Sequence, residues 1–272
     1  MEDIFSIEKK VIVITGGAGS LGASIAEYLV QKGAVLIILG RTSSTLLKHV
    51  NKLNKLIPSS SSSYTADVLN EEKLKEIREN ILNQYGRIDG LINAAGGNLA
   101  EATPNSDQTI FDILPDDLKK VIDLNLMGTV LPSFIFGKIM ANQHSGSIIN
   151  ISSMASKQVL TRVLGYSMGK AGVEIFTKWM AMELATKFGE KMRVNAIAPG
   201  FFIGKQNKEL LLNEDGSYTR RGRKIIKKTP MGRFGYVSDL NGSIQYLLSD
   251  ASKFVTGTIL NVDGGFSSFS GI

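Results

Sequence analysis

A strand, a glycine-rich turn and a helix follow one another directly near the start of the chain. The aliphatic run 11–14 predicts a buried strand, and helix-forming residues extend from about 20 to 32. Glycines at such a junction let a backbone approach a pyrophosphate, whose charge the helix N-terminus favours. A plain tight turn is the alternative, but three glycines there are costly without a ligand. The predicted dinucleotide-binding segment consists of Gly16, Gly17, Ala18, Gly19, Ser20, Leu21 and Gly22.

The alternation of apolar runs with helical stretches continues to the end of the chain. Further strands are predicted at 34–39, 64–67, 88–92, 147–152, 193–198 and 258–262. Helices are predicted at 45–57, 71–85, 116–142, 164–187 and 238–248. The serine-rich segment 58–63 is interpreted as a flexible connector, and 99–114 as an irregular loop. This pattern predicts a single α/β domain over residues 1–272, a Rossmann-type doubly wound parallel sheet with helices on both faces.

Composition excludes several kinds of site. The chain has no Cys and only two histidines, His49 and His144, so disulfides and thiolate metal sites are ruled out and no metal site is predicted. The acidic start of the chain lacks a long apolar segment, and the aliphatic run 35–39 is too short to cross a bilayer. We therefore expect a soluble cytoplasmic protein that needs no membrane.

The end of the second predicted strand bears on the choice of dinucleotide. An acidic residue there would bind the 2′-hydroxyl of NAD, whereas Arg41 suits the 2′-phosphate of NADP. Arginine can also stack on adenine without selecting the phosphate, so NADP is the predicted cofactor and NAD the alternative. Asp67, which ends the next predicted strand, is placed to reach the adenine amino group.

Tyr166 and Lys170 lie four residues apart, on one face of the helix predicted at 164–187. Ser153 ends the preceding apolar run, so strand, loop and helix can bring the three polar groups together. These groups suit carbonyl reduction, in which Tyr gives a proton to the carbonyl oxygen while Ser orients that oxygen. The alternative is an exposed Tyr and a solvated Lys on an amphipathic helix.

The opposite reaction, alcohol oxidation, needs a tyrosinate. Lowering the pKa of Tyr from about 10 to about 7 takes about 4 kcal/mol of preferential phenolate stabilisation, and Lys170 has the charge to provide it. The remaining predicted contacts of this helix are apolar, through Ala171, Ile175, Met182 and Ala185.

A basic cluster distinguishes the segment 201–234, which we interpret as a lid over the substrate. Six cations fall between residues 220 and 228. They predict a solvated helix face or, alternatively, attraction of an acidic substrate. Nucleic-acid binding is not predicted, because no aromatic residues are interleaved with the cations.

Taken in register, these motifs resemble the short-chain dehydrogenase/reductase family over essentially the whole chain. The segment 15–22 resembles the family's cofactor loop, with Ser20 in place of its middle glycine, and 93–96 resembles its Asn-Asn-Ala-Gly motif with the second Asn lost. The resemblance implies a catalytic tetrad of Asn125, Ser153, Tyr166 and Lys170, with Asn125 supporting a proton-relay water. It also implies cofactor contacts by Val68, Asn93, Ala95, Gly96, Tyr166, Lys170, Pro199, Gly200 and Phe202.

Within this family the chain looks most like bacterial D-mannonate oxidoreductases, through the stretches 195–202, 206–207, 229–235 and 263–272. That likeness implies interconversion of D-fructuronate and D-mannonate. The resemblance to the family as a whole implies a homotetramer formed through the long helices and the C-terminal strand. The predicted substrate contacts are Asn98, Ser153, Arg162 and Lys205, with Arg162 pairing the substrate carboxylate. The alternatives are a gluconate 5-dehydrogenase-like or other polyol enzyme and, from another class, a dinucleotide-binding regulator without turnover.

Overall fold

One parallel sheet organises the protein. The computed structural model describes residues 3–105, 107–204 and 208–270. Its seven strands have the order β3-β2-β1-β4-β5-β6-β7, and every neighbouring pair is parallel. The strands are β1 Val11–Thr15, β2 Val35–Gly40, β3 Ser61–Thr65, β4 Gly90–Asn93, β5 Gly146–Ile151, β6 Met192–Pro199 and β7 Ile259–Val262. The predicted doubly wound α/β fold is confirmed.

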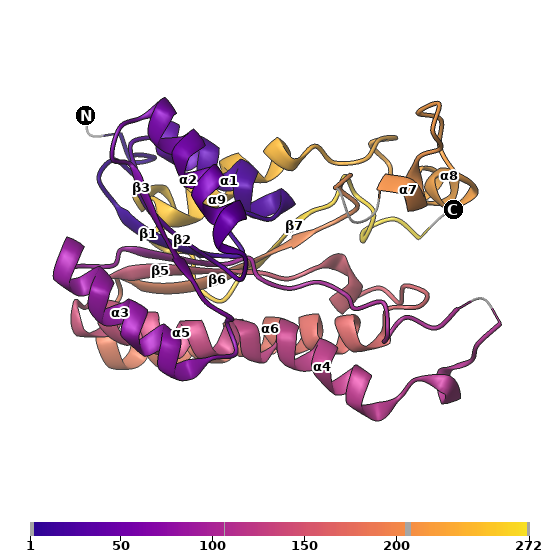
Figure 1. Cartoon of the computed structure of the whole chain (residues 1–272), viewed down its shortest axis with the longest axis horizontal. Coiled ribbons are helices and arrows are strands. Elements are labelled where there is room, and N and C mark those ends of the chain that lie inside the picture. Colours follow the sequence, from indigo (N-terminus) through magenta and orange to yellow (C-terminus); the bar gives the residue numbers. More distant parts are fainter. Residues whose placement is uncertain (1–2, 106, 205–207, 271–272) are drawn as a thin grey trace.

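Helices cover both faces of the sheet (Figure 1). One face carries α1 Ser20–Gln31, α2 Ser43–Leu56 and α9 Asn241–Leu248. The other carries α3 Glu71–Tyr85, α4 Pro115–Asn125, α5 Met127–Asn142 and α6 Leu164–Phe188. Two further helices, α7 Lys208–Leu211 and α8 Arg220–Lys228, lie together near the end of the chain. Short 3₁₀ turns complete the described residues: η1 Ile110–Asp112, η2 Met154–Ser156, η3 Val237–Leu240 and η4 Asp250–Ser252.

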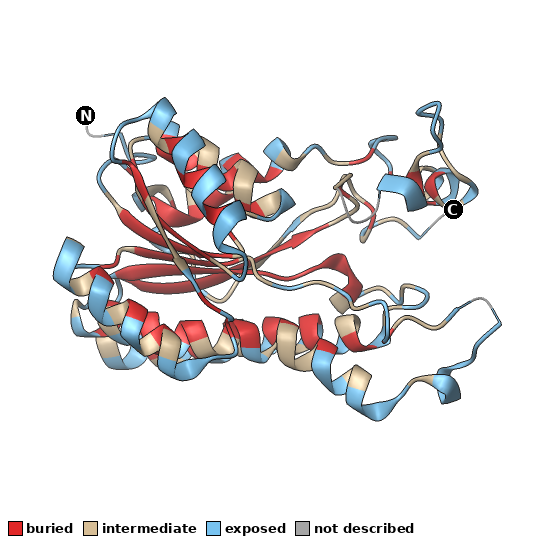
Figure 2. Ribbon diagram, viewed as in Figure 1, coloured by how far each residue is buried: buried red, intermediate tan, exposed pale blue. Residues whose placement is uncertain are grey.

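The aliphatic strands supply both cores. In β1, Ile12 and Ile14 point toward α1, whereas Val11 and Val13 belong to the core under α3, α5 and α6. A strand covered on both sides has no polar face, so it reads as a continuous aliphatic run rather than an alternating one. Figure 2 shows the result, a sheet that is buried at its centre, with exposed residues on the outer sides of the helices and in the loops.

The structure corrects the interpretation of the serine-rich segment. Residues 61–63 are not a flexible connector but the start of β3, which pairs with β2 from Leu36–Ser61 to Gly40–Thr65. The Asn54 side chain of α2 fixes this start, because it accepts from the Ser61 amide at 2.9 Å and donates to the Ser61 carbonyl at 3.0 Å. β3 is an edge strand, so backbone pairing on one side suffices and an aliphatic run is not required.

The predicted apolar side of α6 is also wrong. Ala171, Ile175 and Met182 face outward, with Ile175 58% exposed and Met182 49% exposed. The buried face of this helix instead includes small and polar residues, among them Lys170 and Thr177. Hydrophobicity alone therefore selected the wrong side, because α6 is apolar on its outer surface too.

The stretch Pro115–Asn142, which spans α4 and α5, is the one part of the described chain that is long and apolar enough to cross a membrane, because it contains an 18-residue window with a mean hydropathy of 1.4. Of that window, 56% is buried inside the protein. Phe136 and Met140 of α5 lie fully buried in the core against the sheet. Its apolar character is therefore explained by packing in the core.

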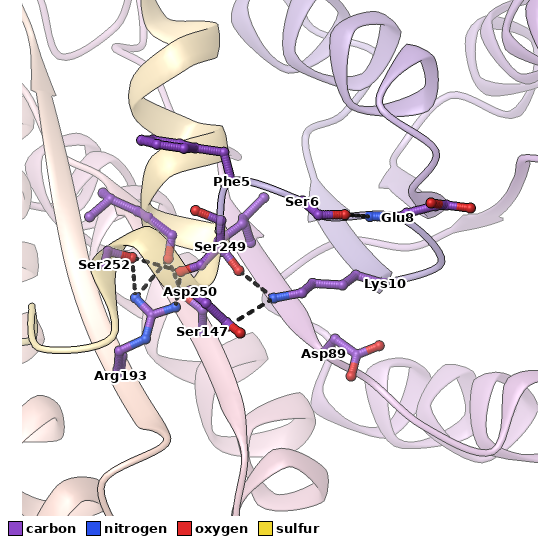
Figure 3. A network of polar contacts seen from close by, with 12 residues as sticks. Phe5, Ser6, Glu8, Lys10, Asp89, Ser147, Arg193, Ser249, Asp250 and Ser252 are labelled. Carbon is purple, nitrogen blue, oxygen red and sulfur yellow. Dashed lines mark hydrogen bonds and ion pairs between the residues drawn. The ribbon is translucent and has the colours of Figure 1, made fainter. Parts of the chain in front are cut away.

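A polar network fastens the amino ends of β1 and β6 to the end of α9 (Figure 3). The buried Arg193 guanidinium donates to the Leu247 carbonyl at 2.8 Å and to the Ser252 hydroxyl at 2.7 Å. Lys10 donates to the Leu248 carbonyl at 2.8 Å, 3.8 Å from the Asp250 carboxylate. Cations at a helix C-terminus satisfy carbonyls that lack partners within the helix. These hydrogen bonds join the amino ends of the strands to α9, whereas the cavities described below lie at the carboxyl ends of the strands.

Candidate functional site

Two cavities lie at the carboxyl edge of the sheet, the usual ligand site of open parallel sheets. The first, about 290 Å³, is lined by Gly16, Ala18, Gly19, Gly40, Arg41, Thr42, Thr45, Leu46, Ala66, Asp67, Val68, Ala94, Ala95, Gly96 and Leu124. The second, about 240 Å³, is lined by Ser20, Leu21, Ile151, Ser152, Ser153, Tyr166, Pro199, Gly200, Phe201, Phe202, Ile203 and Gly204. The glycine-rich turn contributes to both. An elongated ligand can therefore cross the turn with one end in each cavity.

Glycine is required in this turn by close backbone packing. Gly16 has a φ of +65°, and a Cβ there would lie 2.8 Å from Ala95 Cα. A Cβ on Gly22 would lie 2.4 Å from the Gly16 carbonyl oxygen. Gly22 is buried and, like Gly17, lines neither cavity, so these two predicted contacts support the turn from behind.

The N-terminus of α1 fits a phosphate. Gly19 precedes the helix without a side-chain cap, and its first turn contains no acidic residue. The first amides of a helix lack partners within it, and the helix dipole favours negative charge at this end. Together with the close approach that the glycines allow, this end of α1 suits the pyrophosphate of a dinucleotide.

Arg41 and Asp67 lie where the sequence predicts them, in the lining of the first cavity. Both are exposed, and Asp67 accepts a hydrogen bond from the Leu69 amide at 2.9 Å. Within the described residues Arg41 forms no ion pair, so its charge is available to an anionic ligand.

Ser153 and Tyr166 meet in the second cavity. Ser153 follows β5 and caps the turn η2, where its hydroxyl accepts from the Ala155 amide at 3.1 Å. Tyr166 stands in the first turn of α6, hydrogen-bonded to Ser153. Burial raises the pKa of Tyr166, and the bond to Ser153 opposes this only in part. The hydroxyl is therefore held in its protonated form, the form that can donate a proton to a carbonyl.

Lys170 lies beneath Tyr166, buried at 3% exposure. Its Nζ donates to the Ile151 carbonyl at 2.7 Å and lies 5.7 Å from the centre of the Tyr166 ring. Burial lowers the pKa of Lys170 to about 8. In this structure desolvation of the Tyr166 hydroxyl is the largest effect on its pKa, and the role of Lys170 in lowering that pKa stays a prediction.

Asn125 ends α4, at the break before α5, and is fully buried. Its side chain holds the loop after β4, accepting from the Gly97 amide at 3.1 Å and donating to the Gly97 carbonyl at 2.8 Å. A third bond goes to the Val121 carbonyl at 2.8 Å. Asn125 thus fixes the loop beside Lys170, and the relay water remains a prediction.

Two further predicted contacts, Asn93 and Asn98, line neither cavity. Asn93 is buried and donates to Ser133 and Asn150, both at 2.8 Å, so the amide faces the core rather than the cofactor cleft. Asn98 is exposed and donates to the Thr103 hydroxyl at 2.6 Å.

Arg162 is exposed as well, with a φ of +71°, and its Nε donates to the Pro104 carbonyl at 2.6 Å. Arg162 thus contacts the loop 99–105 in this structure, and its pairing with a substrate carboxylate stays a prediction. Lys205, the fourth predicted substrate contact, lies outside the described residues.

The predicted lid is joined to the catalytic turn by a small apolar core. Met154, next to Ser153, packs in this core with Leu211 of α7, Ile225 of α8 and Phe266 near the end of the chain. Phe201, which lines the second cavity, stacks edge-on against Phe266 at 5.2 Å between ring centres. The segment after β6 therefore forms the outer wall of the second cavity.

Sequence reasoning missed one polar residue beside the site. Glu174 of α6 is buried, and its Oε1 accepts from Ser152 at 2.9 Å and from Ser156 at 2.5 Å. The available signal was its spacing, four residues after Lys170 and eight after Tyr166, which places all three on one helix face.

Comparison with known proteins agrees with this geometry. The family model described as Enoyl-(Acyl carrier protein) reductase matches residues 16–267. An uncharacterized oxidoreductase of Bacillus subtilis (strain 168), UxuB, is 40% identical over 97% of this chain and 96% of its own. A solved structure of a provisionally named D-mannonate oxidoreductase from Haemophilus influenza, with bound NAD, has a TM-score of 0.91 and 37% identity, covering 99% of this chain and 100% of its own.

A gluconate 5-dehydrogenase from Burkholderia cenocepacia J2315, solved with NADP and tartrate, has a TM-score of 0.86 and 27% identity, covering 98% of each chain. Structural neighbours thus contain NAD in one case and NADP in the other. The family match and the relatives extend over nearly the whole chain, and the fold matches throughout. The protein is an NAD(P)-dependent oxidoreductase of the short-chain dehydrogenase/reductase family.

Proposed function

We propose that the protein is an NADP-preferring reductase of a keto sugar acid and interconverts D-fructuronate and D-mannonate. The observation that carries this proposal is the pairing of two cavities across the glycine-rich turn. One contains the unpaired cation Arg41, and the other contains Ser153 and Tyr166 in hydrogen-bond contact. This arrangement suits a dinucleotide in the first cavity and a carbonyl group beside its nicotinamide in the second.

The roles of the chain's own residues follow from their positions. Gly16 to Leu21 and the N-terminus of α1 would hold the pyrophosphate, and Pro199, Gly200 and Phe202 would border the nicotinamide. A nicotinamide dinucleotide supplies or accepts the hydride. Ser153 donates a hydrogen bond to the substrate oxygen, and Tyr166 donates the proton that completes the alcohol. Lys170 places a positive charge beneath the phenolate that remains.

The sugar-acid substrate is supported by charge. Helix α8 has six cations, Arg220, Arg221, Arg223, Lys224, Lys227 and Lys228. None of them forms an ion pair within the part of the chain that the structure describes. α8 packs on the apolar core that includes Phe201 of the cavity wall. An anionic substrate is therefore attracted toward this side of the second cavity. Likeness to the Haemophilus protein supports D-fructuronate among such substrates.

The proposal predicts fast consumption of NADPH with D-fructuronate and slower consumption of NADH. The assay is the loss of absorbance of the reduced nicotinamide, measured with each dinucleotide at the same ionic strength. Because Arg41 is exposed and unpaired, the variant Arg41→Asp should lose the preference for NADPH by about 10-fold or more, as expected when a charge-assisted phosphate contact is removed.

Each result of this assay tests a separate part of the proposal. Equal rates with NADPH and NADH in both the wild type and Arg41→Asp would contradict the role of Arg41. Absence of turnover of D-fructuronate, with dinucleotide binding intact, would contradict the substrate assignment. The second candidate, reduction of 5-keto-D-gluconate, is favoured by the likeness to the Burkholderia gluconate 5-dehydrogenase and belongs in the same assay.

We further propose a cytoplasmic homotetramer whose subunits meet through α5 and α6. Seven large apolar side chains are exposed on these two helices, among them Phe134 at 59%, Ile175 at 58%, Trp179 at 63% and Met182 at 49%. Exposed apolar residues gathered in this way are typical of a protein–protein interface.

Substituting Trp179→Asp should reduce the particle mass measured by light scattering to about half or less, because a carboxylate would be buried without a partner in the interface. The matched control is Leu47→Asp, which changes an exposed apolar residue of α2 on the opposite face of the sheet. Unchanged mass in Trp179→Asp would exclude this interface.

A further inference from the structure

We propose that Glu174 is a positioning residue, which holds the turn that presents Ser153 to Tyr166 and to the substrate oxygen. This inference rests on the proposed roles of Ser153 and Tyr166 in carbonyl reduction. It assigns a task to a buried carboxylate that the mechanism above leaves unused.

The contacts of Glu174 converge on both sides of Ser153. Its Oε1 accepts from the Ser152 hydroxyl at 2.9 Å and from the Ser156 hydroxyl at 2.5 Å. The Ser156 hydroxyl also lies 2.6 Å from the carbonyl oxygen of Ser153. One carboxylate oxygen thus ties the residue before Ser153 and the last residue of η2 to α6.

Few other hydrogen bonds join the turn 152–156 to α6. The Ser152 amide donates to the Ile197 carbonyl at 2.7 Å, which fixes the turn to β6. The Ser153 hydroxyl accepts from the Ala155 amide at 3.1 Å and is the hydrogen-bond partner of Tyr166. Among the described residues, two side chains of the body of α6 hydrogen-bond residues 151–156: Lys170, which donates to the Ile151 carbonyl at 2.7 Å, and Glu174, which alone of the two bonds residues of the turn itself.

The spacing of three side chains along α6 explains how Glu174 can position Ser153 relative to Tyr166. Tyr166, Lys170 and Glu174 follow one another at intervals of four residues on one face. The proton donor, the cation beneath it and the holder of its serine partner therefore share one helix of 25 residues. A rigid helix keeps the Ser153–Tyr166 geometry constant, as catalytic groups need positions fixed to fractions of an ångström.

Burial makes the interaction strong enough for this task. Glu174 is 9% exposed, Ser152 1% and Ser153 9%. A hydrogen bond to a carboxylate in such a place is stronger than a bond between neutral groups. Removing the carboxylate leaves the buried Ser152 hydroxyl without its acceptor, and the Ser156 hydroxyl keeps only the Ser153 carbonyl within the turn, so the turn is then free to rearrange.

The test compares kcat in Glu174→Leu, Glu174→Gln and Ser156→Ala. Glu174→Leu removes the acceptor and should lower kcat about 10- to 100-fold, the range in which misplacement of a catalytic group acts. Glu174→Gln keeps an acceptor oxygen and should restore kcat to within about 3-fold of the wild type. Ser156→Ala, which removes one of the two bonds, should lie between them. The dissociation constant of NADPH should not change in any of these variants.

The matched control is Thr177→Val, on the same buried face of α6. The Thr177 hydroxyl accepts from the Asn150 amide at 2.9 Å and donates to the Val173 carbonyl at 2.7 Å, away from the catalytic turn. It should lower the thermal unfolding temperature as Glu174→Leu does, without the loss of kcat. This comparison separates positioning from a general loss of stability.

A double-mutant cycle with Ser153→Ala completes the test. If Glu174 acts through Ser153, Glu174→Leu should lower kcat no further in the Ser153→Ala background. Turnover is measured with D-fructuronate and with 5-keto-D-gluconate, and each variant is compared with the wild type on the substrate that the wild type reduces faster.

Three results would overturn the inference, and they are distinguishable. A normal kcat in Glu174→Leu and Ser156→Ala, with Ser153→Ala impaired, removes the positioning role but leaves the proposed function intact. A normal kcat in Ser153→Ala shows instead that the proposed site is wrong, and the inference fails with it. Equal losses in Glu174→Leu and Thr177→Val would assign both residues to core stability.

Discussion

Replacing Tyr166 with Phe is expected to lower kcat for carbonyl reduction by about 10²- to 10⁴-fold, the usual contribution of general acid catalysis. The substitution removes one hydroxyl, the group that lies in the second cavity in contact with Ser153. The ring and its packing remain, so the thermal unfolding temperature and the dissociation constant of NADPH should stay close to the wild-type values. Near-normal turnover would remove Tyr166 from the proposed role.

The pH dependence of the wild-type oxidation rate provides a second test of the role of Tyr166. Reduction uses the protonated hydroxyl, whereas oxidation of the alcohol needs the phenolate. Because burial raises the pKa of Tyr166, we expect the oxidation rate to increase as the pH rises above neutrality. Tyr166→Phe should lack this increase. A pH-independent oxidation rate in the wild type would show that another group accepts the proton.

Replacing Lys170 with Met is expected to affect both turnover and stability. The substitution removes the cation that lies 5.7 Å from the Tyr166 ring, so kcat should fall about 10²-fold or more. It also removes a buried charge. Burial lowers the pKa of Lys170 from 10.5 to about 8, so protonation of this side chain is less favourable in the folded state than in the unfolded state.

The sign of the stability effect follows from proton binding. Between pH 8 and 10.5 the unfolded chain keeps the Lys170 proton while the folded protein loses it, so the free energy of unfolding rises with pH in this window. From pH 7 to pH 10 the wild type should gain about 2 to 3 kcal/mol relative to Lys170→Met.

Urea unfolding of both proteins at equal concentration checks this prediction, because the assembly state also affects the unfolding midpoint. Comparison of the two proteins cancels the other groups that titrate at these pH values. If the difference in the free energy of unfolding between the wild type and Lys170→Met stayed constant from pH 7 to pH 10, burial would not lower the pKa of Lys170.

The parts of the fold that depend on aliphatic patterning were predictable. The run Val35–Leu39 and its counterparts mark strands, since a sheet covered on both faces leaves no polar positions in its central strands. The third strand was predicted at 64–67, and its start at Ser61 was missed because Ser61 to Ser63 carry no such signal and pairing with β2 is a long-range property of the sheet. The outer face of α6 was mistaken for the inner one, because Ile175 and Met182 are as apolar as core residues.

The candidate site was predictable where residue type and position along an element decide it. Ser153, Tyr166 and Arg41 lie where strand ends and helix spacing place them. The contact of Arg162 with Pro104 was not predictable, because it depends on a loop and a left-handed backbone angle that residue type does not reveal. Residue type likewise does not reveal that the Asn93 amide turns to Ser133 and Asn150.

The serine content of β3 has a consequence for solubility. An edge strand offers unpaired amides and carbonyls to any neighbouring chain, and a long aliphatic edge is a template for aggregation. β3 is five residues long, SSSYT in sequence, and lies at one margin of a sheet whose inner strands are strongly aliphatic. Serine has a low preference for extended pairing, so a second chain gains little by adding to this margin. Ser61 to Ser63, which have no role in the proposed reaction, thus disfavour association of a second chain with the β3 edge of the sheet during folding.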